Sequence, residues 1–421
     1  MSKFVIAAVI VIVLAALGYV NYRRFVPKPE TLGKKAYEVE IHKLSVPAGG
    51  HTLYGELLLP QGLQGKLPTI VCSHGLNGSY HYFRDYVGMC LAMSGYAVCC
   101  FDFYGGSVRG KSGGKMTEMS VFTERDDLNA VIDWVMTQET TDAAQLFLFG
   151  ESQGGFVTAI TAAQRPQDIR AVIEYYPALC IPDDARKRFH SAEEIPVEYK
   201  HMGRRFGRIY CEDLLDYDVY AEIPAYEGPV LILHGDHDQT VDISYGQKAA
   251  AVYKKAEFIC LPGEIHGFTG DGRKKAARLT YDFLQRTLGL DDTEEILRIA
   301  VTLTGGSMKH EGIYNVMTVP FTGTAESKWF KGVILPGAAD VQRRKLWVTE
   351  RFCADYTLEG VDHTGAKCQI HIVNVDEGQG WKPTVTTDSK ALDFLNYGKC
   401  RAVLLGHKDK LTVRIYAKPE G

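Results

Sequence analysis

Short apolar runs alternate with stretches of helical spacing along the first two thirds of this chain. Nearly every position in the runs is apolar, which is typical of strands buried on both faces. The runs cover residues 69–73, 96–101, 146–149, 171–175, 230–233 and 257–261. The helical stretches between them cover residues 82–93, 122–136, 156–165, 245–255 and 273–287. This alternation predicts a parallel sheet with helices on both faces.

Two other segments extend this α/β unit, which we predict to span residues 37–289. Residues 37–46 and 52–59 alternate between apolar and polar positions, as the strands of an edge hairpin do. The interval 179–228 is rich in charged residues and tyrosine, and it is too long for a simple connection. An insertion of that length predicts a functional cap.

A different pattern begins after the acidic residues at 291–295. Apolar and polar positions alternate through short segments separated by Gly and Asp, and a helical period competes only briefly near residues 390–395. The segments cover residues 313–321, 329–335, 346–358, 369–375, 402–405 and 411–416. We predict a separate all-β domain over residues 305–418. A barrel is the expected form, because closure removes exposed strand edges.

The N-terminus carries an apolar or small-residue stretch at residues 4–20, with Arg23 and Arg24 behind it. As a helix this stretch would span about 25 Å, close to the thickness of the hydrocarbon core of a bilayer. We therefore predict a single transmembrane anchor over residues 1–26. A cleaved secretory signal, with its site at residues 16–18, and a buried core helix are the alternatives.

Charge and cysteine content refine this picture. The basic residues behind the anchor favour a cytoplasmic body under the positive-inside rule. Of the 10 cysteines, Cys72, Cys99 and Cys100 fall inside predicted core strands, which is typical of small apolar side chains in a reducing compartment. The formal net charge is −4 and no long basic run occurs, so the sequence predicts no nucleic-acid partner.

A nucleophile motif follows the apolar run at residues 146–149. Residues 150–154 read Gly-Glu-Ser-Gln-Gly, and the predicted helix at 156–165 comes next. In a strand-turn-helix context, Gly-x-Ser-x-Gly forms a sharp turn that exposes the serine hydroxyl above the sheet. The glycines are needed because side chains would collide within the tight turn. We therefore predict Ser152 as a catalytic nucleophile, with a structural glycine turn as the alternative.

A serine nucleophile needs a base and an orienting acid, and both have candidates in the order Ser, Asp, His. The run 230–233 leads into His-Gly-Asp-His-Asp at 234–238, where Asp238 and Asp236 compete for the role of the acid. We choose Asp238, and Asp236 reads as a turn residue. The loop after the last predicted strand supplies His266 as the base. A metal site in the His/Asp string is disfavoured, because no other ligand cluster accompanies it.

The oxyanion of the reaction intermediate needs two backbone N–H donors. One is expected from Gln153, directly after the nucleophile. The other is expected from Leu76, in the loop after the run at 69–73. His74, at the start of that loop, reads as a brace for the loop rather than as a catalytic group.

With these motifs assembled, residues 37–289 resemble bacterial α/β-hydrolases of the cinnamoyl/feruloyl esterase type. The resemblance implies hydrolysis of carboxylic esters without a cofactor, with the cap shaping the substrate pocket. The segments that carry it are His-Gly-Leu-Asn-Gly at 74–78, Phe-Asp-Phe-Tyr-Gly-Gly-Ser at 101–107, the pentapeptide at 150–154, Ile-Pro-Asp-Asp-Ala at 181–185, Leu-His-Gly-Asp-His-Asp at 233–238 and Gly-Glu-Ile-His-Gly-Phe at 263–268.

The C-terminal part, from residue 305 to about 416, resembles a family of small uncharacterised bacterial β-barrel domains. The matching segments are Pro-Phe-Thr-Gly at 320–323, Phe-Lys-Gly at 330–332, Leu-Pro-Gly-Ala-Ala-Asp at 335–340 and Ala-Asp-Tyr-Thr-Leu-Glu at 354–359. Asp355 replaces the family's usual Arg, and Ala338 replaces a second Gly. The resemblance implies a small-ligand cavity at most, and a structural or partner-binding appendage is the alternative.

Three functions are consistent with these features. The first is a membrane-anchored serine esterase acting on hydroxycinnamoyl or small acyl esters. The second is a serine peptidase or amidase acting on short peptides, for which acidic cap residues would bind the substrate amine. The third is an ester-binding module without catalysis, which the complete set of motifs disfavours. The acidic cap residues in question are Asp183, Asp184, Glu193 and Glu194.

Overall fold

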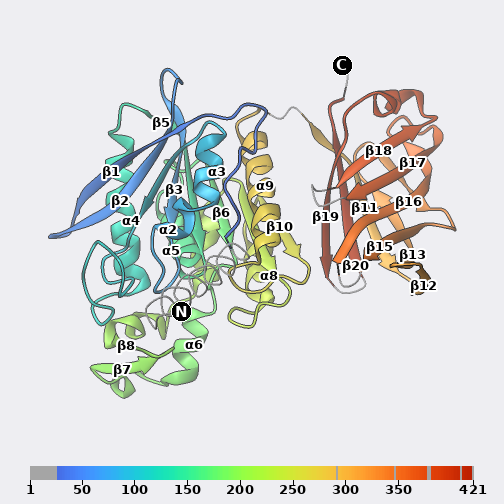
Figure 1. Cartoon of the computed structure of the whole chain (residues 1–421). Helices are drawn as coiled ribbons and strands as arrows, with labels where there is room; N and C mark the ends of the chain where they lie inside the picture. Colours follow the sequence, from blue (N-terminus) through green and yellow to red (C-terminus); the bar gives the residue numbers. More distant parts are fainter. Residues whose placement is uncertain (1–25, 291–292, 346–347, 377–380, 408–409, 420–421) are drawn as a thin grey trace, which may run out of the picture. The chain divides into compact units, whose positions relative to one another are not determined.

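The computed structural model describes residues 26–290, 293–345, 348–376, 381–407 and 410–419 (Figure 1). The described chain forms two compact units whose main boundary lies between Leu288 and Gly289, and the short segment Ile259–Pro262 is grouped with the second unit. The predicted anchor lies almost entirely outside the described residues. No helix among the described residues combines the length and apolar character needed to cross a membrane.

The first unit is built on a sheet whose described strands run in the order β1-β2-β4-β3-β5-β6-β9-β10. The antiparallel pairs β1–β2 and β2–β4 form one side, and the pairs from β4 through β3, β5 and β6 to β9 are parallel. The strands are β1 (Val39–Ala48), β2 (His51–Pro60), β3 (Leu67–Ser73), β4 (Ala97–Phe101), β5 (Thr141–Glu151), β6 (Ala171–Tyr175), β9 (Val230–Gly235) and β10 (Ala256–Leu261).

Helices pack against this sheet in two groups. Helices α3 and α9 contact each other, and so do α4 and α5. Every residue of β4, β6 and β9 is buried, as expected for strands covered on both faces. The predicted parallel sheet is thus confirmed. The helices are α2 (His81–Arg84), α3 (Val87–Met93), α4 (Val121–Met136), α5 (Gln153–Gln164), α8 (Ile243–Val252) and α9 (Gly270–Thr287).

The interval between β6 and β9 forms a separate substructure, which we call the cap (residues 179–228). Figure 1 shows it projecting beyond the sheet at the labels α6, β7 and β8. One apolar cluster joins cap residues such as Phe206 and Tyr210 to Phe156 of α5, so the cap is packed onto the sheet unit. Its elements are α6 (Ile181–Arg188), η1 (Ala192–Glu194), β7 (Glu198–His201), β8 (Arg204–Gly207), η2 (Arg208–Tyr210), η3 (Glu212–Leu214), α7 (Val219–Glu222) and η4 (Ile223–Ala225).

The second unit is an antiparallel β-barrel with the described strand order β18-β17-β16-β14-β13-β11-β20-β19. Strand β12 pairs with β13, and β15 pairs with β13 and β16. The end strands β18 and β19 contact each other, so the sheet closes into a barrel. The elements are β11 (Glu294–Leu303), β12 (Ser307–Glu311), β13 (Tyr314–Glu326), β14 (Phe330–Ile334), β15 (Ala339–Lys345), β16 (Val348–Asp362), β17 (Lys367–Asp376), β18 (Lys382–Thr387), η5 (Lys390–Asn396), β19 (Arg401–His407) and β20 (Lys410–Ala417).

The barrel contains a strand ahead of the predicted start at residue 305. Strand β11 pairs with both β13 and β20. Its side chains Ile296, Leu297, Ile299 and Val301 are buried in the barrel core. The acidic pair that begins this strand resembles a linker in sequence, but the alternation behind it belongs to a strand.

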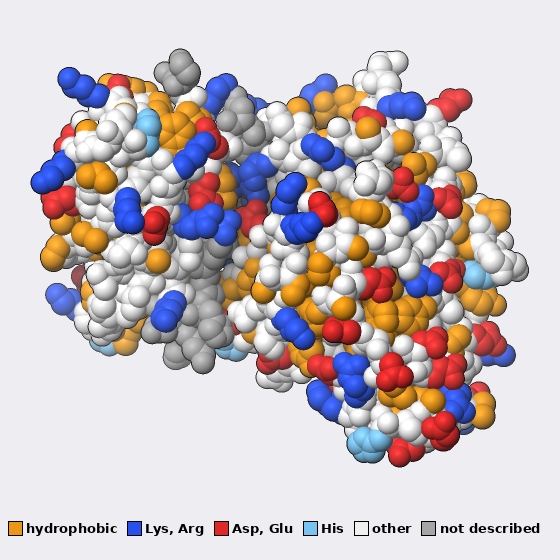
Figure 2. All heavy atoms as spheres, turned by 180° about the vertical axis from the view of Figure 1, so that it is seen from behind, with side chains coloured by type: hydrophobic (Ala, Val, Ile, Leu, Met, Phe, Trp, Pro, Cys, Tyr) orange, Lys and Arg blue, Asp and Glu red, His pale blue; other side chains and the backbone are white. Residues whose placement is uncertain are grey.

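The surface is mixed in charge. Figure 2 shows basic and acidic side chains interspersed over the face that it displays. This distribution agrees with the formal net charge of −4.

Candidate active site

The nucleophile candidate lies in a sharp turn between strand β5 and helix α5. Ser152 has φ 52°, a left-handed conformation that costs energy for a residue with a side chain. A Cβ at Gly150 would come within 2.2 Å of the Gly154 carbonyl oxygen. A Cβ at Gly154 would come within 2.1 Å of the Ser73 carbonyl oxygen. Both positions therefore require glycine, as the motif predicted.

Replacing Gly154 with alanine should destabilise the protein by roughly 3 kcal/mol or more, because the new methyl group meets backbone rather than a movable side chain. Gly110→Ala is the matched control, since the nearest atoms to its Cβ are at 3.6 Å, an ordinary contact. Thermal unfolding of both variants checks this. Equal melting temperatures for the two variants would contradict the tight packing of the turn.

The three predicted catalytic side chains come together in one hydrogen-bonded chain. His266 Nε2 lies 3.0 Å from Ser152 Oγ. His266 Nδ1 lies 2.7 Å from Asp238 Oδ2. The distances suit a base that accepts the serine proton at one ring nitrogen while its other N–H donates to a carboxylate.

Asp238 is held as an ionised group at the end of β9. Its side chain is 1 % exposed, and Oδ1 accepts hydrogen bonds from the N–H groups of Thr240 and Val241 at 2.8 and 2.9 Å. Burial alone would raise its pKa, but hydrogen bonds to His234, His266 and the Val241 N–H outweigh burial and lower it well below the ordinary value. The carboxylate therefore stays charged next to the imidazole at neutral pH.

Asp236, the competing acid, has a different role. Its Oδ1 accepts the Gly263 N–H at 2.6 Å and lies 2.8 Å from Nδ1 of the exposed His237. These contacts tie two loops together, whereas the sequence predicted a turn residue that bonds its own backbone.

The segments that carry the two predicted oxyanion donors adjoin the nucleophile. Gln153 is the first residue of α5, where backbone N–H groups have no partner within the helix. Leu76 follows Gly75, whose Cβ position would lie only 3.0 Å from Ser152 Cβ. The loop that carries Leu76 therefore packs directly against the serine.

His74 lies beneath this loop as a buried neutral side chain. Nδ1 lies 2.8 Å from the Gly75 carbonyl oxygen, and Nε2 accepts the Phe103 N–H at 3.2 Å. This pattern assigns the proton to Nδ1. Burial lowers the pKa of His74 below its ordinary value, against smaller opposing effects of Gly75, Asp102 and Glu151. These contacts correspond to the brace that the sequence predicted.

A second hydrogen-bonded chain runs from the cap to the residue after the nucleophile. The Tyr210 hydroxyl donates to Gln153 Oε1 at 2.7 Å, and Gln153 Nε2 donates to Glu124 Oε2 at 2.8 Å. Burial raises the pKa of Glu124 to about 8. Sequence reasoning missed this chain. The available signal was Glu124, which shares a helical face with Leu128 and Val131 and is therefore an acidic residue on an apolar face.

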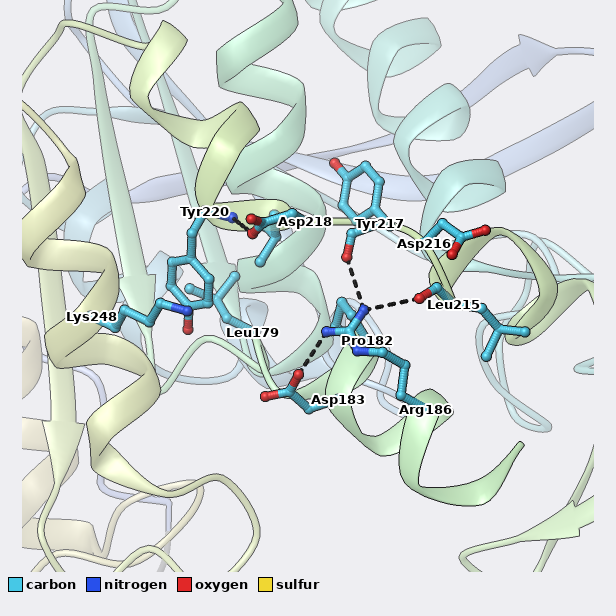
Figure 3. Close-up of a pocket in the computed structure, with 11 residues that line it drawn as sticks. Leu179, Pro182, Asp183, Arg186, Leu215, Asp216, Tyr217, Asp218, Tyr220 and Lys248 are labelled. Carbon is cyan, nitrogen blue, oxygen red and sulfur yellow. Dashed lines mark hydrogen bonds and ion pairs between the residues drawn. The ribbon is translucent and has the colours of Figure 1, made fainter. Parts of the chain in front are cut away.

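A cavity of about 290 Å³ lies between the cap and helix α8 (Figure 3). Arg186 crosses it, bound to Asp183 at 2.6 Å and to the carbonyl oxygens of Leu214, Leu215 and Tyr217. The Lys248 ammonium stacks 3.8 Å from the Tyr220 ring centroid. The lining is Leu179, Pro182, Asp183, Arg186, Leu215, Asp216, Tyr217, Asp218, Val219, Tyr220 and Lys248.

The acidic cap residues proposed as an amine site are largely engaged by neighbouring groups. Asp183 pairs with Arg186 at 2.6 Å, and Asp184 pairs with Lys187 at 3.3 Å. Glu194 accepts the His190 N–H at 2.8 Å. No group of metal-ligating side chains was found among the described residues.

Comparison with known proteins identifies the first unit. Residues 82–291, about half of the chain, match the model of the prolyl oligopeptidase family, Peptidase_S9. The structure of Est1E from Butyrivibrio proteoclasticus with bound ferulic acid is 26% identical. It aligns with a TM-score of 0.54 over 58% of this chain and 99% of Est1E. The chain contains an α/β-hydrolase domain. A complex of DcsB with a substrate analogue shares the α/β-hydrolase fold, at 15% identity and a TM-score of 0.50 over 59% of this chain and 100% of DcsB.

Curated relatives of this α/β-hydrolase carry different names. An uncharacterized peptidase of Bacillus subtilis, YuxL, is 25% identical over 272 residues, which are 58% of this chain and 39% of YuxL. A putative phosphoribosyl transferase of Mycobacterium tuberculosis is 26% identical over 249 residues, which are 58% of this chain and 45% of that protein. The chain thus spans less than half the length of these relatives.

Proposed function

We propose that this α/β-hydrolase is a serine carboxylic ester hydrolase that acts through Ser152, His266 and Asp238. The observation that carries the proposal is the chain from Ser152 Oγ through His266 to Asp238, with separations of 3.0 and 2.7 Å. The packing of Gly75 against Ser152, and the position of Gln153 directly after the serine, support an oxyanion hole made of the Leu76 and Gln153 N–H groups.

The reaction follows from the roles of these groups. His266 Nε2 takes the Ser152 proton as Oγ attacks the ester carbonyl, and the Leu76 and Gln153 N–H groups stabilise the oxyanion that forms. Collapse of the intermediate releases the alcohol, protonated by His266, and leaves an acyl group on Ser152. Water then attacks the acyl-enzyme while His266 takes its proton. As the second intermediate collapses, His266 returns this proton to Ser152 Oγ, which releases the acid and restores the serine. No cofactor enters this sequence.

The substrate class proposed is hydroxycinnamoyl or small acyl esters. It is supported by the likeness to Est1E, whose structure holds ferulic acid. Two tyrosines of the cap contact helix α5, which begins directly after Ser152: the Tyr210 hydroxyl donates to Gln153, and the Tyr217 ring packs near Phe156. Tyr217 and Tyr220 line the cavity between the cap and α8.

A serine peptidase acting on short peptides is the second candidate. The match to the prolyl oligopeptidase family and the likeness to the peptidase YuxL favour it. The engagement of Asp183 and Asp184 by basic neighbours weighs against it, because a substrate amine would have to compete for those carboxylates.

A substrate panel tests the proposal. Feruloyl, 4-coumaroyl and short acyl esters are compared with aminoacyl 4-nitroanilides as kcat/KM ratios, in wild-type protein and in the Ser152→Ala variant. We expect ester hydrolysis that depends on Ser152 and exceeds amide hydrolysis. Serine-dependent cleavage of the amides alone would establish the peptidase instead.

We further propose that residues 1–26 anchor the protein in a membrane with its body on the cytoplasmic side. Deletion of these residues should give a soluble and active protein. The body retains its own contacts to the segment that follows, such as the Leu32 N–H to Ser94 Oγ bond of 2.8 Å.

The full-length chain should remain with membranes in carbonate and require detergent for extraction. A mature N-terminus near residue 19 would show a cleaved signal instead, and a C-terminal compartment reporter tests the side.

A further inference from the structure

Glu151, the second residue of the nucleophile pentapeptide, places both of its carboxyl oxygens in hydrogen bonds next to the catalytic chain. The residue is 8% exposed. Its Oε1 accepts the Gly75 N–H at 3.0 Å, and its Oε2 accepts the Tyr176 hydroxyl at 2.8 Å. Burying a carboxyl group destabilises the folded state unless its oxygen atoms accept hydrogen bonds. Here both partners belong to segments that touch the active site.

The first of these bonds fixes the oxyanion loop. Glu151 holds the Gly75 N–H, and His74 Nδ1 holds the Gly75 carbonyl oxygen at 2.8 Å. The Gly75 carbonyl and the Leu76 N–H belong to one planar peptide unit. Fixing Gly75 at both of its ends therefore sets the direction of the Leu76 N–H, the second donor proposed for the oxyanion.

The second bond reaches the base. The Tyr176 ring lies 4.6 Å from the His266 ring, centroid to centroid. Its hydroxyl also bonds to the Tyr82 hydroxyl. Burial and then the charge of Glu151 raise the pKa of Tyr176 far above its ordinary value, so that it remains a neutral donor. Tyr176 has φ 36°, a strained conformation that surrounding contacts must maintain.

The contacts that run from Glu151 through Tyr176 to Tyr82 continue to Arg273, behind His266. The Arg273 guanidinium lies 4.8 Å from the Tyr82 ring centroid. Arg273 Nε donates to the Gly267 carbonyl oxygen at 3.1 Å, in the residue directly after His266. This series of contacts thus reaches the His266 ring through Tyr176, and the backbone next to His266 through Arg273.

We propose that Glu151 is a positioning residue of the catalytic site: its carboxyl group holds the oxyanion loop and the His266 ring in place around Ser152. The inference rests on the proposed function, since it assigns Glu151 a part in that reaction. Glu151 does not touch the substrate or the reacting atoms. It acts through Gly75 on the oxyanion donor and through Tyr176 on the base.

The test measures kcat and KM on a 4-nitrophenyl ester, with each rate divided by the number of sites that a fluorophosphonate titrates. Glu151→Leu removes both hydrogen bonds at similar volume. We expect kcat to fall about 100-fold, because a displacement of about 1 Å in a catalytic group has that effect, while KM changes less than about threefold. Glu151→Gln keeps an acceptor for the Gly75 N–H, so its kcat should be at least about tenfold higher than that of Glu151→Leu.

A further variant, Tyr176→Phe, keeps the test decisive if Glu151→Leu fails to fold, and Glu174→Gln serves as a control. Tyr176→Phe removes only the bond toward the base, and its kcat should fall between those of wild type and Glu151→Leu. Glu174→Gln is the matched control. It alters a buried glutamate of the neighbouring strand β6 that binds Tyr253 at 2.8 Å, away from the catalytic chain. Burial raises the pKa of Glu174 to about 8, so glutamine resembles its neutral form and kcat should not change.

The outcomes separate this inference from the proposed function. Wild-type protein without Ser152-dependent ester hydrolysis would reject the proposed function. An active wild type whose Glu151 and Tyr176 variants keep full kcat per titrated site would reject only the positioning role. If Glu151→Leu lowers the melting temperature but leaves kcat unchanged, Glu151 stabilises the fold and does not position the catalytic groups.

Discussion

The Ser152→Ala variant should fold normally and lose ester hydrolysis by a factor of at least about 10³ in kcat. The nucleophile, base and acid act as one unit, so removal of any member leaves only binding and oxyanion stabilisation. The hydroxyl contacts His266 Nε2 at 3.0 Å, while the backbone of Ser152 keeps its bonds to Tyr175 and Ala178. Melting temperature and kcat on a 4-nitrophenyl ester measure the two effects.

A fluorophosphonate provides a second readout for this variant. Wild-type protein should take up one equivalent at Ser152, as peptide mass spectrometry can locate, and the alanine variant should take up none. Ser73→Ala is the matched control, because its buried hydroxyl has no hydrogen-bond partner among the described residues and its loss should leave activity intact. Labelling that persists in Ser152→Ala would place the nucleophile elsewhere.

The sequence predicted the α/β unit well because its main signals are local. Continuous apolar runs identify strands buried on both faces, and the described strands β4, β6 and β9 are buried throughout. The nucleophile turn needs glycine at two fixed positions, so it is visible as a pentapeptide. The chain order Ser, Asp, His then directs attention to Asp238 and His266.

The contacts that the sequence did not predict join distant segments. Tyr210 contacts Gln153 from the cap, and Tyr176 contacts Glu151 from the position directly after strand β6. Neither tyrosine belongs to a motif, and tyrosine is common in this chain, so nothing local distinguishes these two. Strand β11 was missed for a different reason, because its first two residues, Glu294 and Glu295, belong to the acidic stretch that was interpreted as a junction.

The choice between the two aspartates depends on the tautomer of His266. In Asp238→Asn the side-chain oxygen can keep the Thr240 and Val241 N–H bonds, which leaves the amide NH₂ facing His266 Nδ1. The imidazole must then accept there, so its proton moves to Nε2 and it can no longer accept the Ser152 proton. We expect kcat to fall about 10³- to 10⁴-fold.

Stability should change in the same direction. The folded-state pKa of Asp238 lies below its unfolded value, so ionised Asp238 stabilises the fold at neutral pH. This stabilisation is lost as pH falls from the unfolded pKa through the folded one. Asp238→Asn should therefore lower the melting temperature at pH 7, and the difference from wild type should shrink in acid.

Asp236→Asn is the matched comparison for Asp238→Asn. Its Oδ1 accepts the Gly263 N–H at 2.6 Å, and an asparagine oxygen can accept the same bond. Because Asp236 contacts the exposed His237 and not His266, the tautomer of the base is untouched and kcat should stay within about threefold of wild type. Steady-state kinetics of both variants at pH 7 decide the matter. A larger loss for Asp236→Asn than for Asp238→Asn would reverse the assignment of the catalytic acid.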